Sequence, residues 1–501
     1  MDPPSAKVNA SILTTVATPR KTTRRGSFLI ALAIVVAALG VYMLAPQFLM
    51  VAELGLYNQQ FRLRGPLPGN DQVVIVAIDE PSLGAIGRWP WPRSVLAERF
   101  KALGVGGAAV REVERERRDA DHDRKLADAI AASGRVVLAS TFTVRQGAPT
   151  KAPVGEGQPV KSALASFKHR DERSTYPPPS ADAMGVPIPP LLAAATSLGH
   201  VNMLPDSDGT TRWELLVIEH KGHYYPSLAL ETVRVAAGID PFALRLDFGR
   251  AVELGAIAIP IDPRARVLVD YAGPNKTFTY IPAASLLRGD VPAERLKDRI
   301  VFVGATAEGT YDLRVTPFSP VLPGVEKHAN MAANILAGRF IIRPAWVELV
   351  EAGGILVFPL LLGWILPRLR PVTSVGATVL LGAGFIGATH VAFRQGLWLP
   401  AVYPSLAIAL TFVGITVYRF LTEERQRLWT KRAFQQYVSP EVVEQMVEDP
   451  AALQFGGELR PLTVLFSDIR DFTTFTERHD PQEVVQMLRE YLTRMTDCVL
   501  K

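Results

Sequence analysis

The chain has 501 residues, of which 48% are hydrophobic and 21% are charged, and its formal net charge is +5. This apolar fraction excludes a chain that is disordered throughout. The single cysteine, Cys498, excludes an intramolecular disulfide and a multi-cysteine metal site. The mean hydropathy is positive, at +0.15, so we expect the apolar residues to be concentrated in membrane segments. The basic excess is then expected to flank those segments rather than to bind nucleic acid.

Four uncharged stretches are predicted to be transmembrane helices. The first, residues 27–52, follows a basic arm at residues 1–26 and exceeds the roughly 20 residues that span a bilayer. A cleaved signal peptide has an apolar core of only about 7–15 residues, so a retained anchor is favoured. The others are residues 345–367, 371–393 and 396–418. Their near lack of charge disfavours the alternative of three buried core helices.

The basic residues at the ends of these stretches predict the orientation. The arm 1–26 stays in the cytoplasm, which places residues 53–344 outside it. Arg368 and Arg370 mark the inner side between the second and third spans. The chain returns to the cytoplasm after the fourth span, so residues 419–458 form a cytoplasmic, helix-compatible linker.

Residues 53–344 alternate strand-like and helix-like patterns, which predicts a mixed α/β domain. The continuous β-branched run at residues 72–79 is typical of a buried strand. The further expected strands are residues 135–139, 213–219, 265–270 and 299–303, and the expected helices are residues 92–103, 228–237 and 328–337. Residues 146–180 are rich in Pro, Gly, Lys and Ser and are predicted to be an exposed insertion.

Two groups of polar residues in this domain are candidates for ligand binding. Asp79 and Glu80 follow a strand end, where sites in α/β sheets are common, although a carboxylate that caps the next turn is the favoured interpretation. The domain also carries the histidines His200, His220, His223 and His328. Apart from His220 and His223, which share a short turn, they lack the spacing of metal ligands, so a metal site is disfavoured.

Three stretches of the outer domain carry a family resemblance. They are VVIVAIDEPSLGAIGRWPWPRSVLAERFKALG, GHVNMLPDSDGTTRWELLVIEHKGHYYPSLALE and DRIVFVGATAEGTYDLRVTPFSPVLPGVEKHANMAANILAG. Together with the helical triplet that follows, they resemble the second type of CHASE sensor domain. The resemblance implies an extracytoplasmic sensor of a bacterial cyclase or kinase, in the inner (plasma) membrane, whose signal is unknown. Residues 108–123 depart from the family, through surface divergence or a reading-frame error, which puts any ligand site there in doubt.

The tail after the linker has the pattern of a nucleotide site. Residues 462–466 are predicted to be a strand that ends before Asp468, and Asp471 is the expected N-cap of a helix at residues 472–478. A second helix is expected over residues 480–501. Such an aspartate can hold Mg²⁺ and a helix N-terminus can bind phosphates, although a turn carboxylate without a metal produces the same pattern.

The string PLTVLFSDIRDFTTFTE, preceded by QQYVSPEVVEQM, resembles the first strand and helix of class III adenylate/guanylate cyclases. By this resemblance, Asp468 matches the metal-binding aspartate and Ile469 the residue whose carbonyl ligates metal. The loop whose N–H groups contact the triphosphate is matched by Arg470, Asp471, Phe472 and Thr473. At the position of Asp471, many members of the family have Gly.

This resemblance implies two Mg²⁺ or Mn²⁺ ions, ATP (or GTP) as the substrate, and a homodimer. One ion would activate the ribose 3′-hydroxyl and the other would steady the triphosphate. Residues 459–501 correspond to the start of a ferredoxin-like α+β domain. The catalytic residues are expected beyond Lys501, so residues 1–501 alone are expected to be inactive.

The sequence therefore predicts a multidomain membrane protein, with a mixed α/β extracytoplasmic sensor, four transmembrane helices and the start of a ferredoxin-like cyclase domain. Its expected function is a sensor-coupled adenylate/guanylate cyclase in signal transduction. The alternative is a membrane receptor without catalysis. A sensor kinase is disfavoured, because the only histidine after the fourth span, His479, lies inside the cyclase-like run.

Overall fold

The computed structural model describes residues 19–86, 90–91, 122–144, 161–307, 312–434 and 466–500. It divides into two units, Met1–Thr422 and Glu423–Lys501. The helix expected at residues 92–103, residues 108–121 of the divergent segment and residues 462–465 of the expected strand lie outside the described residues.

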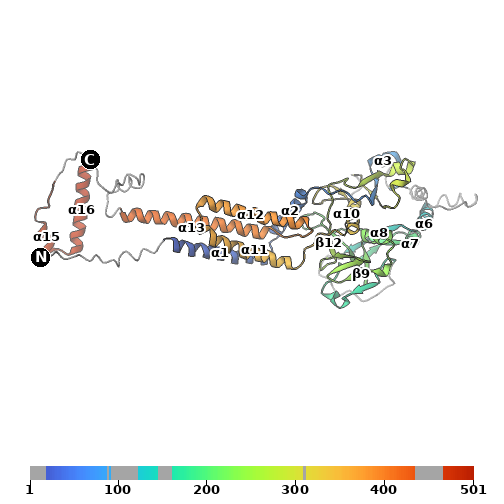
Figure 1. The fold of residues 1–501 in the computed structure, drawn as a ribbon, viewed down its shortest axis with the longest axis horizontal. Helices are drawn as coiled ribbons and strands as arrows, with labels where there is room; N and C mark the ends of the chain where they lie inside the picture. The colour runs from blue at the N-terminus through green and yellow to red at the C-terminus, as the bar shows by residue number, and fades with distance from the viewer. Residues whose placement is uncertain are drawn as a thin grey trace, which may run out of the picture. The chain divides into compact units, whose positions relative to one another are not determined.

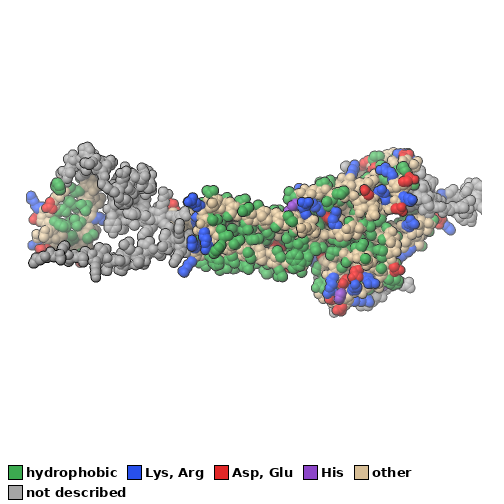
Figure 2. Space-filling view, viewed as in Figure 1, with side chains coloured by type: hydrophobic (Ala, Val, Ile, Leu, Met, Phe, Trp, Pro, Cys, Tyr) green, Lys and Arg blue, Asp and Glu red, His purple; other side chains and the backbone are tan. Residues whose placement is uncertain are grey.

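Within the described residues, four helices are long and apolar enough to cross a bilayer, as the sequence predicts. They are α1 (Pro19–Leu44), α11 (Trp346–Ile365), α12 (Pro371–Arg394) and α13 (Val402–Phe434). Their candidate spans are Arg24–Leu44, Trp346–Arg368, Pro371–Arg394 and Val402–Thr422. Most residues of these spans are not buried within the chain, and Figure 2 shows their hydrophobic side chains covering the bundle surface. The chain is thus a membrane protein with a lipid-compatible helical bundle.

Two boundaries of this bundle differ from the expected ones. The first helix ends at Leu44 instead of continuing to residue 52, and a separate helix, α2 (Gln47–Arg64), follows. Pro46 explains the break, because proline lacks an N–H group and disfavours helical geometry in the residue before it; Ala45 has φ 42°. At the other end, α13 continues beyond residue 418 into the predicted linker.

In the described part of the outer domain, three strands form a parallel sheet. Its order is β13 (Thr279–Pro282), β1 (Val73–Ile78) and β14 (Ile300–Ala305). All six residues of β1 are buried, which confirms the strand predicted from its β-branched run. The helices α3 (Glu80–Ile86) and α9 (Ala283–Arg288) pack together beside it.

The other described part of this domain is built from antiparallel and mixed sheets (Figure 1). One sheet has the order β11 (Ile257–Pro260), β10 (Ala251–Leu254), β9 (Leu244–Asp247), β3 (Ser166–Lys168), and another has the order β4 (Ala181–Gly185), β2 (Val137–Val144), β5 (Ser197–His200). The two-stranded pairs are β7 (Val217–His220) with β8 (His223–Pro226), β12 (Arg266–Leu268) with β6 (Trp213–Leu215), and β15 (Leu313–Arg314) with β16 (Leu322–Pro323). The helices of this part are α6 (His122–Ser133), α7 (Pro189–Ala194) and α8 (Leu228–Ala236). The domain is therefore mixed α/β, as expected.

Two expectations for this part are wrong. Residues 213–219 form two strands instead of one, because the chain changes partner at the buried Leu216. Its N–H donates to the Ala265 carbonyl next to β12 (3.1 Å), and its carbonyl accepts from the Ser227 N–H next to β8 (2.9 Å). In the predicted exposed insertion, the described residues from 161 onward are integrated into the domain. Leu164 is buried, and β3 pairs with β9 in parallel.

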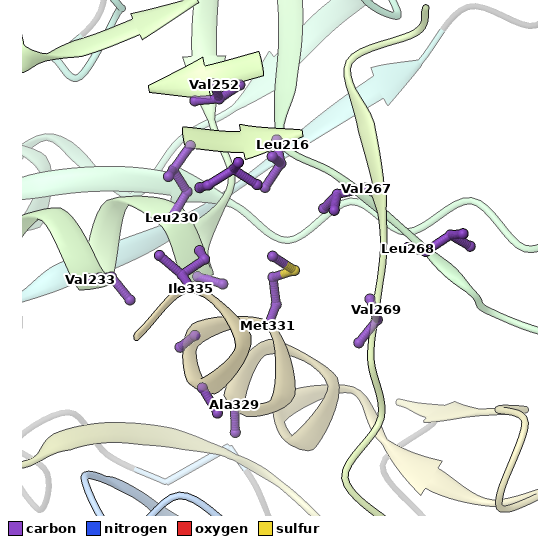
Figure 3. Packing of buried hydrophobic residues seen from close by; sticks show 14 of the residues in the cluster. Leu216, Leu230, Val233, Val252, Val267, Leu268, Val269, Ala329, Met331 and Ile335 are labelled. Atoms are coloured by element: carbon purple, nitrogen blue, oxygen red, sulfur yellow. The ribbon is translucent and has the colours of Figure 1, made fainter. Parts of the chain in front are cut away.

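Helix α10 (Gly324–Ala337) forms the centre of the main hydrophobic core. Its residues from Gly324 to Ile335 are all buried, and Figure 3 shows Met331 and Ile335 rising from it toward Leu216 and Leu230. Such a helix, buried on all sides, must be accommodated by close packing against several elements. After residues 338–345, it is followed by the second membrane helix, α11.

Besides the end of α13, the second unit contains the described helices α15 (Phe472–Arg478) and α16 (Pro481–Leu500). The Asp480 carboxylate accepts a hydrogen bond from the Gln482 N–H (3.1 Å) and so caps α16. Both helices fall where the sequence predicts them.

Candidate functional site

The nucleotide-type segment forms a tight turn between Asp468 and α15. The exposed Asp468 carboxylate accepts a hydrogen bond from the Ile469 N–H through Oδ1 (2.9 Å). The Ile469 carbonyl accepts one from the Phe472 N–H (3.3 Å). The turn thus presents the carboxylate to solvent at the start of a helix, and it brings the six sequence-predicted residues 468–473 together.

Asp471 occupies the N-cap position of α15 but does not cap it through its side chain, so this part of the prediction is wrong. Its backbone is left-handed (φ 57°), and its carbonyl accepts from the Phe475 N–H (3.0 Å). A residue in this conformation cannot orient its side chain as an ordinary extended N-cap residue does. Glycine adopts the left-handed region without steric cost, which is consistent with a glycine at this position in many cyclases.

The donor chemistry of this turn suits a hard divalent cation, because carboxylate and carbonyl oxygens are what Mg²⁺ prefers. The Asp468 carboxylate and the Ile469 carbonyl are oxygens of this kind. Within the described ranges, no group of three His, Cys, Asp or Glu residues is placed to hold a metal ion. In the outer domain, His220 bonds through Nδ1 to the Ala181 carbonyl (2.8 Å).

The carboxylate at the end of β1 acts as a helix cap. Asp79 Oδ1 accepts from the Ser82 N–H (3.0 Å) and from its hydroxyl (2.5 Å) at the start of α3. The same hydroxyl oxygen accepts from the Ala284 N–H of α9 (3.0 Å). This supports the capping interpretation of Asp79.

A second candidate site lies where the outer domain meets the membrane helices, and α2 is its central element (Figure 1). One face of α2 buries residues every three or four positions; they are Leu49, Glu53, Leu54, Tyr57, Gln60 and Phe61. This periodicity is the sequence signal for a packed helix, but residues 45–52 continue the uncharged run of the first span, which obscures it. We call this region the sensor–membrane junction.

On the membrane side of the junction, Glu53 caps α13. Its carboxylate is buried and accepts from the Ala401 N–H (3.0 and 3.1 Å) and the Val402 N–H (2.8 Å). Burial raises the pKa of this carboxyl, while the two hydrogen bonds act to lower it. A carboxylate at a helix N-terminus also interacts favourably with the helix dipole.

On the sensor side, Arg212 ties α2 to the outer domain. This guanidinium is fully buried, and it pairs with Asp206 (2.8 Å) and Asp208 (2.6 Å). It also donates to Asn58 Oδ1 (3.1 Å) and to the Leu54 carbonyl (3.2 Å) of α2. Removing it would leave the mostly buried Asp206 carboxylate without its cation, which is costly.

A third link joins Arg64, the last residue of α2, to Asp270. The two form a buried ion pair, and Arg339 also contacts Asp270 (2.6 Å). Asn334 of α10 fixes Asp270 through both main-chain groups, accepting from its N–H (2.9 Å) and donating to its carbonyl (3.0 Å). The Arg64 guanidinium lies 4.7 Å from the centre of the Phe61 ring. Helix α2 is therefore held by the same segment that is anchored to α10.

Aromatic side chains fill the space between these polar links. The buried Tyr57 of α2 lies 4.6 Å from Trp398 and 5.6 Å from Phe393 between ring centroids. Phe61 lies 4.9 Å from Phe393 in an edge-to-face arrangement. Such pairs restrict relative movement, because aromatic contacts are geometrically selective.

The sensor core also contains a buried ionic cluster, here defined as His200, Glu214, Lys327 and His328. Glu214 and Lys327 form a fully buried ion pair. Burial alone would raise the pKa of Glu214, but Lys327 and His328 outweigh it and lower that pKa to about 2. Burial lowers the pKa of His200 to about 3, so its imidazole is neutral. Such a cluster is sensitive to any change that unbalances its charges.

Comparisons with known proteins match both parts of the chain. The CHASE2 domain model matches residues 30–366, and the adenylate and guanylate cyclase catalytic domain model matches residues 457–501. "Adenylate cyclase 1" of Rhizobium meliloti (strain 1021) is 39% identical over 69 residues. That match spans 13% of this chain and 10% of the relative, so the chain covers about a tenth of that protein's length. No solved structure matches the chain. With about two thirds of its residues inside the CHASE2 match, the chain belongs to the CHASE2 domain family.

Proposed function

We propose that this chain carries the sensor, the membrane bundle and the start of the catalytic domain of a sensor-coupled nucleotide cyclase that makes cyclic AMP from ATP. The observation that supports this proposal most is the cyclase match at residues 457–501, in which Asp468 lies in an exposed turn before a helix. The name of the matched relative, an adenylate cyclase, supports ATP over GTP.

The roles of the turn residues follow from their groups. The Asp468 carboxylate and the Ile469 carbonyl would hold divalent ions, Mg²⁺ or Mn²⁺. The main-chain N–H groups of Arg470, Asp471, Phe472 and Thr473 would contact the triphosphate, as amides at the start of a helix favour anions. When bound, two such ions would supply activation of the ribose 3′-hydroxyl and neutralisation of the leaving pyrophosphate.

We further propose that α2 transmits the signal of the outer domain to the membrane bundle. It is bonded to the sensor core through Arg64 and Arg212 and to the first residues of α13 through Glu53. Helix α13 extends from Val402 to Phe434, past the end of its membrane span. A displacement of its N-terminus can therefore be transmitted along one continuous helix toward the residues that follow the span. Buried, well-packed links of this kind transmit displacement because packed cores are not continuously deformable.

The proposed location is a bacterial inner membrane, with the outer domain in the periplasm and the cyclase part in the cytoplasm, and the proposed assembly is a homodimer through the cyclase domain. The basic residues at the bundle end that carries Arg24, Arg25 and Arg368 support this orientation (Figure 2). A reporter fused after residue 250 should read periplasmic, and a cytoplasmic reading there would contradict the arrangement.

The competing function is a membrane receptor without catalysis. The observation that favours it is that, among the described residues, no group of three His, Cys, Asp or Glu side chains is placed to hold a metal ion. One experiment distinguishes the two functions. Membranes from cells that express the whole reading frame are incubated with ATP or GTP and with Mg²⁺ or Mn²⁺, and the formation of cyclic AMP and cyclic GMP is measured.

In that assay, Asp468→Ala should abolish cyclic nucleotide formation, whereas Asp480→Ala, which removes only a cap of α16, should preserve it. Equal turnover by the wild type and Asp468→Ala would contradict the metal role of Asp468. No turnover by the wild type would favour the receptor.

A further inference from the structure

A cleft with a volume of about 390 Å³ opens between α1 and α11 at the end of the membrane bundle that lies away from the outer domain. Arg24, Arg25 and Arg368 contribute three guanidinium groups to its lining, and Phe28 and Trp364 contribute aromatic rings. Figure 2 shows Lys and Arg side chains gathered at this end of the bundle. The cleft is thus both cationic and apolar.

The close approach of the two helices at Gly363 builds this cleft. A Cβ atom on Gly363 would lie 2.6 Å from the Ala31 Cβ and 3.6 Å from the Phe28 Cα, so only glycine permits this contact. Arg24 lies seven residues, or about two helical turns, before Ala31. Arg368 follows Gly363 by five residues in the next turn of the chain. The helix contact therefore gathers basic residues that are far apart in sequence.

The lining of the cleft contains no carboxylate, and the two glutamates of α11, Glu348 and Glu351, lie in its first two turns, away from Gly363 and Arg368. Neither residues 19–44 nor residues 363–401 contain an Asp or Glu. Arg368 lies over the Trp364 ring, 4.3 Å from its centre, and donates one hydrogen bond to the Trp364 carbonyl. A guanidinium has five N–H donors, so donors of Arg368 remain for a ligand. Arg419 nearby differs, because it spans two main-chain carbonyls, those of Leu366 (3.1 Å) and Leu369 (3.2 Å).

We propose that this cleft binds the phosphate of an anionic phospholipid from the leaflet on that side of the membrane. Arginine pairs with phosphate through several parallel hydrogen bonds, and basic pockets between membrane helices bind anionic headgroups. The apolar part of the lining argues for a lipid rather than a soluble phosphate. Phe28 is 43% exposed and Trp364 56% exposed, so both offer apolar surface to acyl chains beside the charged groups.

Occupancy would hold the start of α1 against the end of α11. These two helices flank the outer domain in sequence, since α1 precedes it and α11 follows it. The composition of the membrane would therefore influence the helices on both sides of the sensor, independently of any ligand of the outer domain and of the cyclase activity proposed above.

The test is native mass spectrometry of the full chain released from nanodiscs that contain phosphatidylglycerol and phosphatidylcholine. The wild type should retain phosphatidylglycerol selectively, and the triple variant Arg24→Gln, Arg25→Gln, Arg368→Gln should lose about tenfold or more of it, since each basic residue contributes about 1 kcal/mol near a charged surface. The matched control Arg62→Gln, Arg288→Gln, Arg394→Gln removes the same net charge elsewhere and should retain the lipid within about twofold. Equal losses in both variants, or no loss in the first, would overturn the proposal.

Two further measurements distinguish a lipid from a soluble phosphate and test the cleft without arginine substitutions. Release of the lipid by millimolar inorganic phosphate would identify a soluble phosphate as the ligand and overturn the lipid proposal. In the unmutated cleft, brominated phosphatidylglycerol should quench tryptophan fluorescence more than brominated phosphatidylcholine does, and Trp364→Phe should remove that difference. This second measurement does not depend on the folding of the arginine variants, and equal quenching by both lipids would contradict a specific site.

Discussion

Glu53 of α2 accepts a 2.8 Å hydrogen bond from the main-chain nitrogen of Val402, the first residue of α13, across 349 positions of the sequence. The buried carboxylate also accepts from Ala401. These bonds satisfy N–H groups that a helix cannot satisfy internally at its N-terminus. Glu53, which follows the first membrane span in the sequence, thereby caps the N-terminus of the fourth membrane helix.

Replacing Glu53 by Ala should loosen the start of α13. Loss of a helix cap typically costs about 0.5–2 kcal/mol, and here two N–H groups would lose their buried acceptor. Hydrogen exchange of full-length protein in detergent should therefore show faster exchange at Ala401 and Val402 than in the wild type. Glu53→Gln keeps a carbonyl acceptor and should fall between the two; unchanged exchange in Glu53→Ala would contradict the capping role.

Breaking the Arg64–Asp270 pair should strongly destabilise the junction. Removal of one partner of a buried ion pair costs about 3–5 kcal/mol, because the other charge remains buried without compensation. Asp270→Ala would leave both Arg64 and Arg339 unpaired, so its thermal unfolding temperature should drop more than that of Arg339→Ala.

The exposed pair Arg288–Asp290 provides the control for this prediction. Its side chains are 57% and 55% exposed, and exposed pairs contribute at most about 1 kcal/mol. Asp290→Ala should therefore leave the unfolding temperature nearly unchanged. A drop for Asp290→Ala as large as that for Asp270→Ala would show that the junction pair has no special role.

The stability of the outer domain should fall as the pH falls below 6.5. Burial lowers the pKa of His200 from 6.5 to about 3, so between these values the unfolded state binds a proton that the folded state excludes. The free energy of unfolding then decreases by at most about 1.4 kcal/mol for each pH unit. Urea unfolding at several pH values measures this slope.

The variant His200→Leu should flatten the slope in this window, because it removes the titrating imidazole from a fully buried site. Glu214 contributes in a lower window: its pKa is about 2 in the folded protein, so its stabilisation is present above 4.5 and is lost as the pH falls toward 2. A slope between pH 6.5 and 5 that is identical in His200→Leu and the wild type would contradict the assignment to His200.

Gly199 should not tolerate a side chain. A Cβ atom there would collide with the main chain of Leu228, at its Cα and, at 2.8 Å, at its nitrogen. Overpacking of this kind typically costs about 1–3 kcal/mol, so Gly199→Ala should unfold at a lower urea concentration. Gly84→Ala, in α3 with no atom within 4 Å of the added Cβ, should be neutral or stabilising by about 0.5–1 kcal/mol.

Much of the fold could be predicted from local patterns. The buried strand β1, helix α8 and the four apolar helices all carry their periodicity or apolar length in consecutive residues. The turn at Asp468 was likewise found from a continuous string, and the family matches include that string. Such features depend on residues that are neighbours in the chain, and neighbouring residues are what sequence patterns report.

Other features could not be predicted in this way. Pro46 was visible in the sequence, but the uncharged run around it suggested one span of residues 27–52, whereas the chain forms α1 and then α2. The described part of the expected insertion joins the domain because β3 pairs with β9, about 80 residues away. Arg212 is charged, yet it is fully buried because two aspartates and α2 surround it.

The sequence by itself determined the class of the protein: an α/β sensor of the CHASE2 family, four apolar spans and the beginning of a cyclase-type segment. Only the tertiary structure decided that α2 joins the sensor to α13 and that Arg24, Arg25 and Arg368 share one cleft. The physical reason is that hydrophobicity and helical periodicity act over a few residues, whereas buried ion pairs, helix caps and close helix contacts join residues that are hundreds of positions apart.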